Sequence, residues 1–224
     1  MEGVSLRENL EQVRERIARA AERSGRQASD ITLIAVTKKF PASVIRDAFD
    51  LGLREFGENY VQEFEGKFPL LQDLLPQARF QLIGHLQSNK ARKASELFRV
   101  IQTVDSVKLA QRLDGMGVPM DTMIEVKLSG EESKEGAAPD EIPAIAEALR
   151  GSRNLRLTGL MTMPPWSEDP EQTRPYFRQL ATLARRENLP HLSMGMSHDL
   201  EAAIEEGATH VRVGTALFGR RRKD

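Results

Sequence analysis

The sequence has 224 residues, enough for one large domain with a sizeable core, and 32 Lys and Arg are balanced by 33 Asp and Glu. This balance argues against nucleic acid or an anionic membrane as a partner. Cysteine is absent, which excludes disulfides, thiolate metal sites and a cysteine nucleophile. Residues 1–25 are charged throughout and no stretch approaches the roughly 20 apolar residues of a membrane span, so we expect a cytoplasmic protein.

The first elements of the chain are a helix, a strand and a second helix. Apolar residues recur every three or four positions over 6–20, with Arg and Glu between them, which predicts an amphipathic helix. Residues 31–38 (ITLIAVTK) are too apolar to alternate, as is typical of a strand buried on both faces in a parallel sheet. Residues 41–52 then predict a helix with Pro41 in its first turn and Gly52 just past its end.

The same strand-then-helix alternation continues to the end of the chain. Seven later segments have the character of strands: 54–59, 79–86, 99–106, 121–129, 155–163, 191–197 and 210–219. Helical patterns lie between them, for example at 140–151, 170–188 and 199–207. We therefore predict an α/β fold in which residues 1–224 form one domain, a single TIM-type (β/α)8 barrel.

Two details complete the fold prediction. Only RRRKD follows the last predicted strand, so we expect the extra N-terminal helix to cover the position where a final helix would pack. The alternative architecture is an open doubly wound sheet. No G-x-G-x-x-G follows any strand to mark the dinucleotide crevice of such a sheet, so the barrel is favoured.

Barrels of this type carry their working residues at the carboxyl ends of the strands. Lys38 ends the most apolar strand, and apolar surroundings lower the pKa of an ammonium, which makes the amine a better nucleophile toward an aldehyde. The bland alternative is a lysine that extends into solvent, as its neighbour Lys39 is expected to do.

Small and hydroxyl-bearing residues mark the ends of the last two strands. Ser197, Gly214 and Thr215 offer hydroxyls and accessible backbone N–H groups, and barrels often bind a phosphate between the loops after strands seven and eight. The alternative is that Ser197 caps a helix and the glycine serves a turn.

Arg212 lies two residues before Gly214 on one strand, and alternate residues of a strand point to the same side. We therefore expect both residues to point into the barrel mouth. A buried arginine needs an acceptor, and Glu125 and Asp105 are plausible ion-pair partners. His85 also ends a predicted strand. The histidines are scattered singly, without metal-ligand spacing, so we predict no metal site.

Six short segments, in order and at similar spacing, resemble the pyridoxal-phosphate homeostasis protein family over nearly the whole chain. They are AVTK (35–38), FGENYVQE (56–63), IGHLQSNK (83–90), GLMTM (159–163), SMGMSHDLEAAI (193–204) and VRVGTALFG (211–219). The resemblance implies a single-domain barrel of the alanine racemase N-terminal type. It also implies that pyridoxal 5'-phosphate (PLP) is carried as a Schiff base and serves cofactor homeostasis, with no established catalytic turnover.

The resemblance also implies roles for individual residues. Lys38 matches the Schiff-base lysine, Asn59 a residue near the cofactor ring, Ser197, Gly214 and Thr215 the phosphate cradle, and Arg212 the arginine that faces the pyridine nitrogen. Such an arginine disfavours protonation of that nitrogen and weakens the cofactor as an electron sink. Two positions depart from the pattern. His85, which we count among the binding residues, is often proline in bacterial members, and His198 stands where many members carry an acid.

The alternative function is a PLP-dependent amino-acid racemase or lyase on the same barrel. Racemases of this type take a second catalytic base from a C-terminal domain, whereas this sequence ends five residues after Gly219, and neither Tyr60 nor Tyr176 obviously replaces that base. A pure interaction scaffold would leave the inward polar residues without a task. We expect a non-catalytic monomer that delivers PLP to apo PLP-dependent enzymes, with Lys134 in the loop after the fifth strand as a possible relay.

Overall fold

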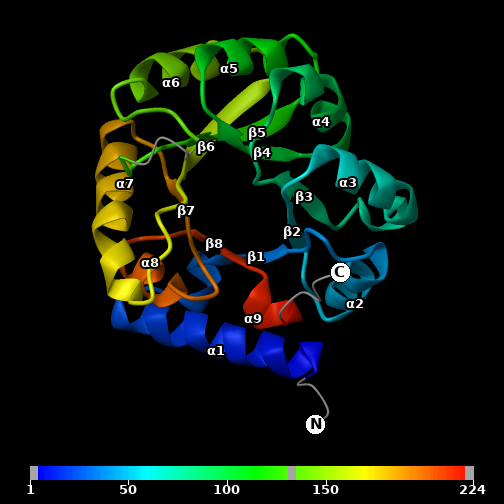
Figure 1. The fold of residues 1–224 in the computed structure, drawn as a ribbon, viewed down its shortest axis with the longest axis vertical. Coiled ribbons are helices and arrows are strands. Elements are labelled where there is room, and N and C mark those ends of the chain that lie inside the picture. Colours follow the sequence, from blue (N-terminus) through cyan, green and yellow to red (C-terminus); the bar gives the residue numbers. More distant parts are fainter. Residues whose placement is uncertain (1–4, 131–134, 220–224) are drawn as a thin grey trace.

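The structure is a computed structural model that describes residues 5–130 and 135–219. Eight parallel strands close into one barrel in chain order, and helices surround it (Figure 1), which confirms the predicted fold. The strands are β1 (Thr32–Val36), β2 (Glu55–Glu58), β3 (Arg79–Leu82), β4 (Val100–Val104), β5 (Met120–Glu125), β6 (Leu155–Met161), β7 (His191–Met196) and β8 (His210–Val213). Pairing of β8 with β1, with Ala35 opposite Val213, closes the barrel.

The helices lie outside the barrel, and within the described ranges none is long and apolar enough to cross a membrane. The α-helices are α1 (Leu6–Arg23), α2 (Ala42–Asp50), α3 (Val61–Lys67), α4 (Ala91–Leu97), α5 (Val107–Asp114), α6 (Ile142–Arg150), α7 (Arg174–Arg186), α8 (Leu200–Glu205) and α9 (Thr215–Phe218). A short 3₁₀ segment, η5 (Pro170–Thr173), precedes α7 and accounts for the start of the helix predicted over 170–188.

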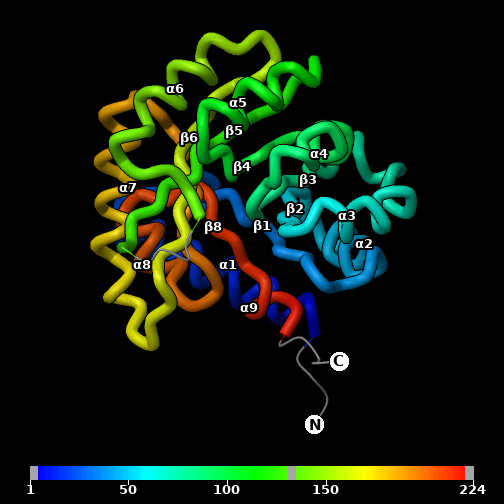
Figure 2. The backbone as a smooth tube through the Cα atoms, turned by 45° about the horizontal axis from the view of Figure 1, so that its top comes forward, coloured from blue at the N-terminus to red at the C-terminus, as the bar shows by residue number. Residues whose placement is uncertain are grey.

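The N-terminal helix covers the gap after the last strand, as predicted. α1 packs against α8 and α9 (Figure 2) and buries Leu10, Val13 and Ile17. A capping box fixes its start, because the Ser5 hydroxyl accepts from the Glu8 N–H while the Glu8 carboxylate accepts from the Ser5 N–H.

Several predicted boundaries were wrong: the strands predicted to end at 38, 86 and 129 end at Val36, Leu82 and Glu125, and two further differences concern the last strand and the second helix. The last strand ends at Val213 and not at 219, because Thr215–Phe218 turn into α9, where the Phe218 N–H donates to the Gly214 carbonyl at 2.9 Å. Pro41 lies one residue before the first helical residue of α2 and not inside its first turn. Gly52 does lie just past the end of that helix, with a φ of +91° that favours glycine.

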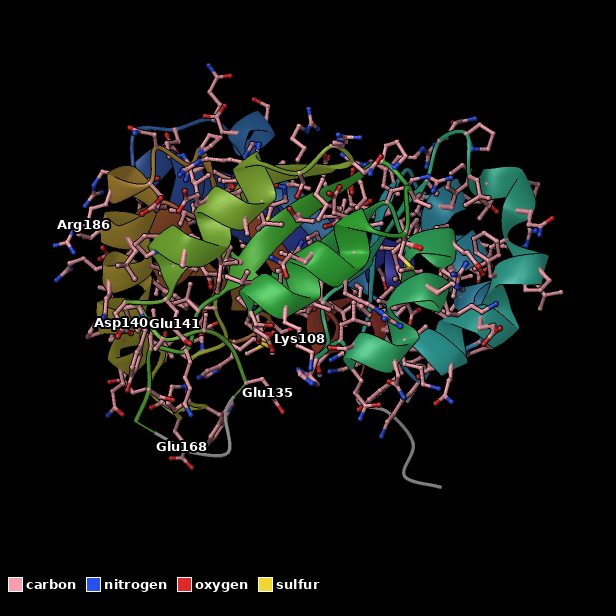
Figure 3. The ribbon with its side chains drawn as sticks, turned by 90° about the horizontal axis from the view of Figure 1, so that it is seen from above. Lys108, Glu135, Asp140, Glu141, Glu168 and Arg186 are labelled. Carbon is pink, nitrogen blue, oxygen red and sulfur yellow. The ribbon has the colours of Figure 1, made fainter. Side chains whose placement is uncertain are left out.

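The carboxyl ends of the parallel strands meet at one end of the barrel. Glu135, in the loop after β5, and Glu168, in the loop after β6, project at this end of the molecule in Figure 3. We call this end the mouth. The amino ends of the strands form the opposite face.

Candidate cofactor-binding site

Lys38 lies in a tight turn immediately after β1. The turn is closed by the Phe40 N–H, which donates to the Thr37 carbonyl at 3.1 Å. Lys39 has a φ of +64°, which is uncommon for a residue with a side chain, and its N–H donates to Glu63 at 2.5 Å. Lys38 is half-buried, unlike the exposed Lys39. The turn therefore holds one lysine at the mouth and directs the next one to the surface.

A buried lysine that the sequence analysis missed fixes the same turn. Lys67, the last residue of α3, donates from Nζ to the Thr37 carbonyl at 3.0 Å and to Glu58 Oε1 at 2.9 Å, and its Nζ lies 2.6 Å from Glu63 Oε1. Burial raises the pKa of the Glu58 carboxyl, although the Lys67 ammonium opposes this shift. In the sequence Lys67 ends an ordinary polar helix, so no pattern marks it as buried.

The predicted phosphate residues lie together at the ends of β7 and β8. The Ala216 N–H donates to Ser197 Oγ at 3.1 Å and so links the two loops. A Cβ placed on Gly214 would lie 3.4 Å from the Val36 carbonyl oxygen, so the loop after β8 packs on the end of the strand that precedes Lys38. Arg16 of α1 donates to the Ser197 carbonyl at 2.9 Å, which anchors the loop from outside. Thr215 begins α9 and is exposed.

Arg212 is buried inside the barrel, but its acceptors are not the predicted ones. Its Nη1 donates to Ser193 Oγ and its Nη2 to the Thr162 carbonyl, both at 2.8 Å. The prediction of an ion pair with Glu125 or Asp105 is therefore wrong, because the neutral oxygens of Ser193 on β7 and Thr162 after β6 accept from the guanidinium instead. Burial lowers the pKa of Arg212 to about 10, so the guanidinium keeps its charge at neutral pH.

A chain of hydrogen bonds crosses the barrel interior beneath Arg212. Ser193 Oγ donates to Gln102 Oε1 at 2.6 Å, Gln102 Nε2 to Gln81 Oε1 at 2.6 Å, and Gln81 Nε2 to Glu55 Oε2 at 2.5 Å. These links join the buried arginine to the opposite face of the barrel. Because each member is oriented by the next, the chain fixes the position of the Arg212 side chain.

Asn59 and His85 lie on the other side of the mouth and line one pocket of about 320 Å³. The Asn59 Oδ1 atom is buried without a hydrogen-bond partner among the described residues. His85 Nδ1 lies 3.7 Å from Asp105 Oδ2 and 3.5 Å from Glu135 Oε2. One ligand atom from each of these three residues lies within 4.8 Å of the others, which sequence spacing did not reveal because they follow different strands.

Glu125 is a second deeply buried acid at the mouth, besides Glu58. It ends β5, is 2% exposed, and its Oε2 has no hydrogen-bond partner within the described part of the chain. Burial raises the pKa of Glu125 to about 7, with Arg212 opposing the shift and Asp105 and Glu135 adding to it. The mouth thus has a basic side near β1 and β8 and an acidic side near β4 and β5.

Three comparisons with known proteins bear on this site. The pyridoxal phosphate homeostasis protein of Pseudomonas aeruginosa is 46% identical, over 97% of this chain and 96% of its own length. The structure of PipY from Synechococcus elongatus PCC7942 with PLP bound is 40% identical, covers 91% of this chain and all of that one, and superposes with a TM-score of 0.80. An alanine racemase from Corynebacterium glutamicum is 18% identical with a TM-score of 0.68, covering 95% of this chain and 61% of that one, which shows a shared fold alone.

The family model described as "Alanine racemase, N-terminal domain" matches residues 8–222. Together with the near-full-length relatives, this match confirms the resemblance found in the sequence: the chain belongs to the pyridoxal phosphate homeostasis protein family, on the barrel fold of the alanine racemase N-terminal domain.

Proposed function

We propose that this chain binds PLP at the mouth of its barrel through Lys38 and holds it for supply to other proteins without turning over a substrate. The observation that carries the proposal is the PLP-bound PipY relative, 40% identical over 91% of this chain. When bound, the cofactor supplies an aldehyde that forms a Schiff base with a lysine amine. The turn that carries Lys38 follows the carboxyl end of β1 and is fixed by Lys67, which supports Lys38 as that amine.

The loops after β7 and β8 fit the phosphate. Ser197 Oγ accepts from the Ala216 N–H, so its own hydrogen is left to donate to an anion. Gly214 has no side chain to obstruct a group that approaches the backbone, and the Thr215 hydroxyl is exposed beside it. These three residues, next to the end of β1, make a cradle from which a short aromatic ring could reach Lys38.

The remaining side chains fit the ring of the cofactor. Arg212 is held by two neutral acceptors and stays charged, and a fixed cation near the pyridine nitrogen disfavours its protonation. The unpartnered Asn59 Oδ1 offers a buried acceptor, and His85 lines the same pocket. Because an unprotonated ring is a weak electron sink, these residues favour holding the cofactor over carbanion chemistry.

The cellular location and the partners of the chain are also part of the proposed function. We propose a cytoplasmic monomer whose recipients are apo PLP-dependent enzymes, with no nucleic-acid or membrane partner. Lys134, which we considered as a relay for transfer, lies outside the described residues. The relatives named as homeostasis proteins support a non-catalytic role.

A racemase or lyase remains the alternative function, and the likeness to alanine racemase bears on the fold alone. Tyr60 is exposed after β2 and Tyr176 lies on the outer helix α7, so neither is set inside the barrel as a second base. We expect no racemisation of either alanine enantiomer above background at saturating PLP. Turnover that disappears in Lys38→Ala would establish the alternative.

Transfer of the cofactor tests the proposed function directly. PLP-loaded protein is mixed with an apo PLP-dependent enzyme in the presence of an excess of an aldehyde trap that removes unbound PLP. We expect the loaded protein to restore more activity than an equal amount of free PLP, and the Lys38→Ala variant to lose this advantage. Equal reactivation by loaded protein and free PLP would contradict protected delivery.

A further inference from the structure

The face opposite the mouth carries a pocket that the proposed function does not use. It has a volume of about 460 Å³ and lies at the amino ends of β3 to β6. Four arginines line it: Arg79, Arg99, Arg153 and Arg156. Because Lys38 follows the carboxyl end of β1, this pocket and the mouth lie at opposite ends of the parallel barrel.

The positive charge of the pocket is only partly neutralised. Asp121, the one acid among the described residues that line it, accepts from Arg79 Nη2 at 2.7 Å and from Arg156 Nε at 2.6 Å. Arg99 and Arg153 make no side-chain hydrogen bond or ion pair with any described residue. Four guanidinium groups against one carboxylate leave a local excess of about three positive charges, in a protein whose net charge is −1.

The carboxylates of two aspartates, Asp114 and Asp121, fix the walls of the pocket. Asp114 Oδ1 accepts from the N–H groups of Arg153 and Asn154, at 3.1 Å and 3.0 Å, so the loop before β6 is tethered to the end of α5. Arg79 is the first residue of β3, and its side chain is fixed by the pair with Asp121. Asp121 thus orients Arg79 and Arg156, whereas the side chains of Arg99 and Arg153 can bind a ligand.

We propose that this basal pocket binds a small phosphorylated anion. A planar guanidinium donates two parallel hydrogen bonds to a phosphate, and several arginines together suit a group with more than one negative charge. The pocket volume lies in the range of sites for single small molecules. A second hollow of about 130 Å³ shares Arg79, Asp121 and Arg156 and is also lined by the carboxylate of Glu55, so the excess of positive charge belongs to the outer pocket.

Calorimetric titration of the PLP-loaded full-length protein with inorganic triphosphate tests this site, because PLP then occupies the proposed phosphate cradle at the mouth. We expect one triphosphate per chain, and binding about tenfold or more weaker in the double variant Arg99→Gln/Arg153→Gln, whose side chains support nothing else in the described structure. The control is Arg7→Gln/Arg186→Gln, which removes the same charge from exposed positions outside the pocket and should bind as the parent does. Ser197→Ala separates the basal pocket from the proposed phosphate cradle and should leave triphosphate binding unchanged.

Four results would overturn the proposal. Absence of triphosphate binding would remove the site, and equal weakening in both double variants would show that only the total charge matters. Binding lost in Ser197→Ala but kept in Arg99→Gln/Arg153→Gln would place the anion at the mouth. A single-stranded oligonucleotide that binds more tightly than triphosphate through the same arginines would make this a nucleic-acid surface. The unfolding midpoints of the parent and the variants are also measured, and equal midpoints verify that each protein is folded in the titrations.

Discussion

The buried carboxyl of Glu125 should contribute to the pH dependence of this protein's stability, and Glu125→Gln should remove that contribution. Burial raises the pKa of Glu125 from 4.5 to about 7 in the folded protein. Between these values Glu125 binds more protons in the folded state than in the unfolded state, so its contribution to the free energy of unfolding falls as pH rises from 4.5 through 7. At about 1.4 kcal/mol for each pH unit, the ionised carboxyl costs about 3 kcal/mol above pH ~8.

Urea unfolding of the parent and of Glu125→Gln, followed by circular dichroism at several pH values and equal cofactor content, measures this effect. Glutamine keeps the shape but cannot ionise, so the variant should be more stable than the parent by about 3 kcal/mol at pH ~8, and the difference should vanish near pH ~4. Glu147→Gln, at an exposed position of α6, is the matched control and should leave stability unchanged. If Glu125→Gln and the parent kept a constant difference over this range, the carboxyl would not be held in the buried state described.

Three further substitutions test the framework around the mouth. Lys67→Met should destabilise the protein by about 3 kcal/mol or more because it leaves a buried carboxylate without its cation. Lys93→Met, which breaks more exposed ion pairs, should have a much smaller effect, and thermal unfolding compares the two variants. Gly84→Ala should lower the yield of folded protein and PLP binding together, because its Cβ would lie 2.2 Å from the Asn59 carbonyl oxygen. Gln102→Leu removes the centre of the hydrogen-bond chain and should weaken PLP retention, measured by dialysis, by about tenfold, while unchanged retention would show that Arg212 does not need the chain.

The order and type of the elements were predictable because each strand is a short apolar run between helical patterns. Their ends were harder to place. Residues 210–219 look like one continuous strand in the sequence, yet the chain leaves the barrel at Gly214 and forms α9. Apolar residues at 216–218 pack outside the barrel as well as they would inside it, so composition alone did not locate the break.

Site residues that lie in recognisable motifs were predicted from the sequence. Residues that reach the site only through contacts between distant segments were not. Strand-end position led to Lys38, Ser197 and Gly214, and the structure brings the ends of their strands together. The buried role of Lys67 depends on how α3 packs, which its own sequence does not encode. Gln81 and Gln102 are polar residues inside apolar strands, and they are the sequence signal for the interior hydrogen-bond chain, which we did not predict.

Covalent attachment of PLP to Lys38 is the central claim, and peptide mapping after borohydride reduction of the PLP-loaded protein tests it most directly. We expect an absorbance band in the visible range before reduction and one reduced adduct, located on Lys38. The adduct should be absent from Lys38→Ala and present in the control Lys39→Ala, because the turn directs Lys39 to the surface. An adduct of full yield in Lys38→Ala, or one mapped to Lys39 or Lys127 in the parent, would contradict the assignment.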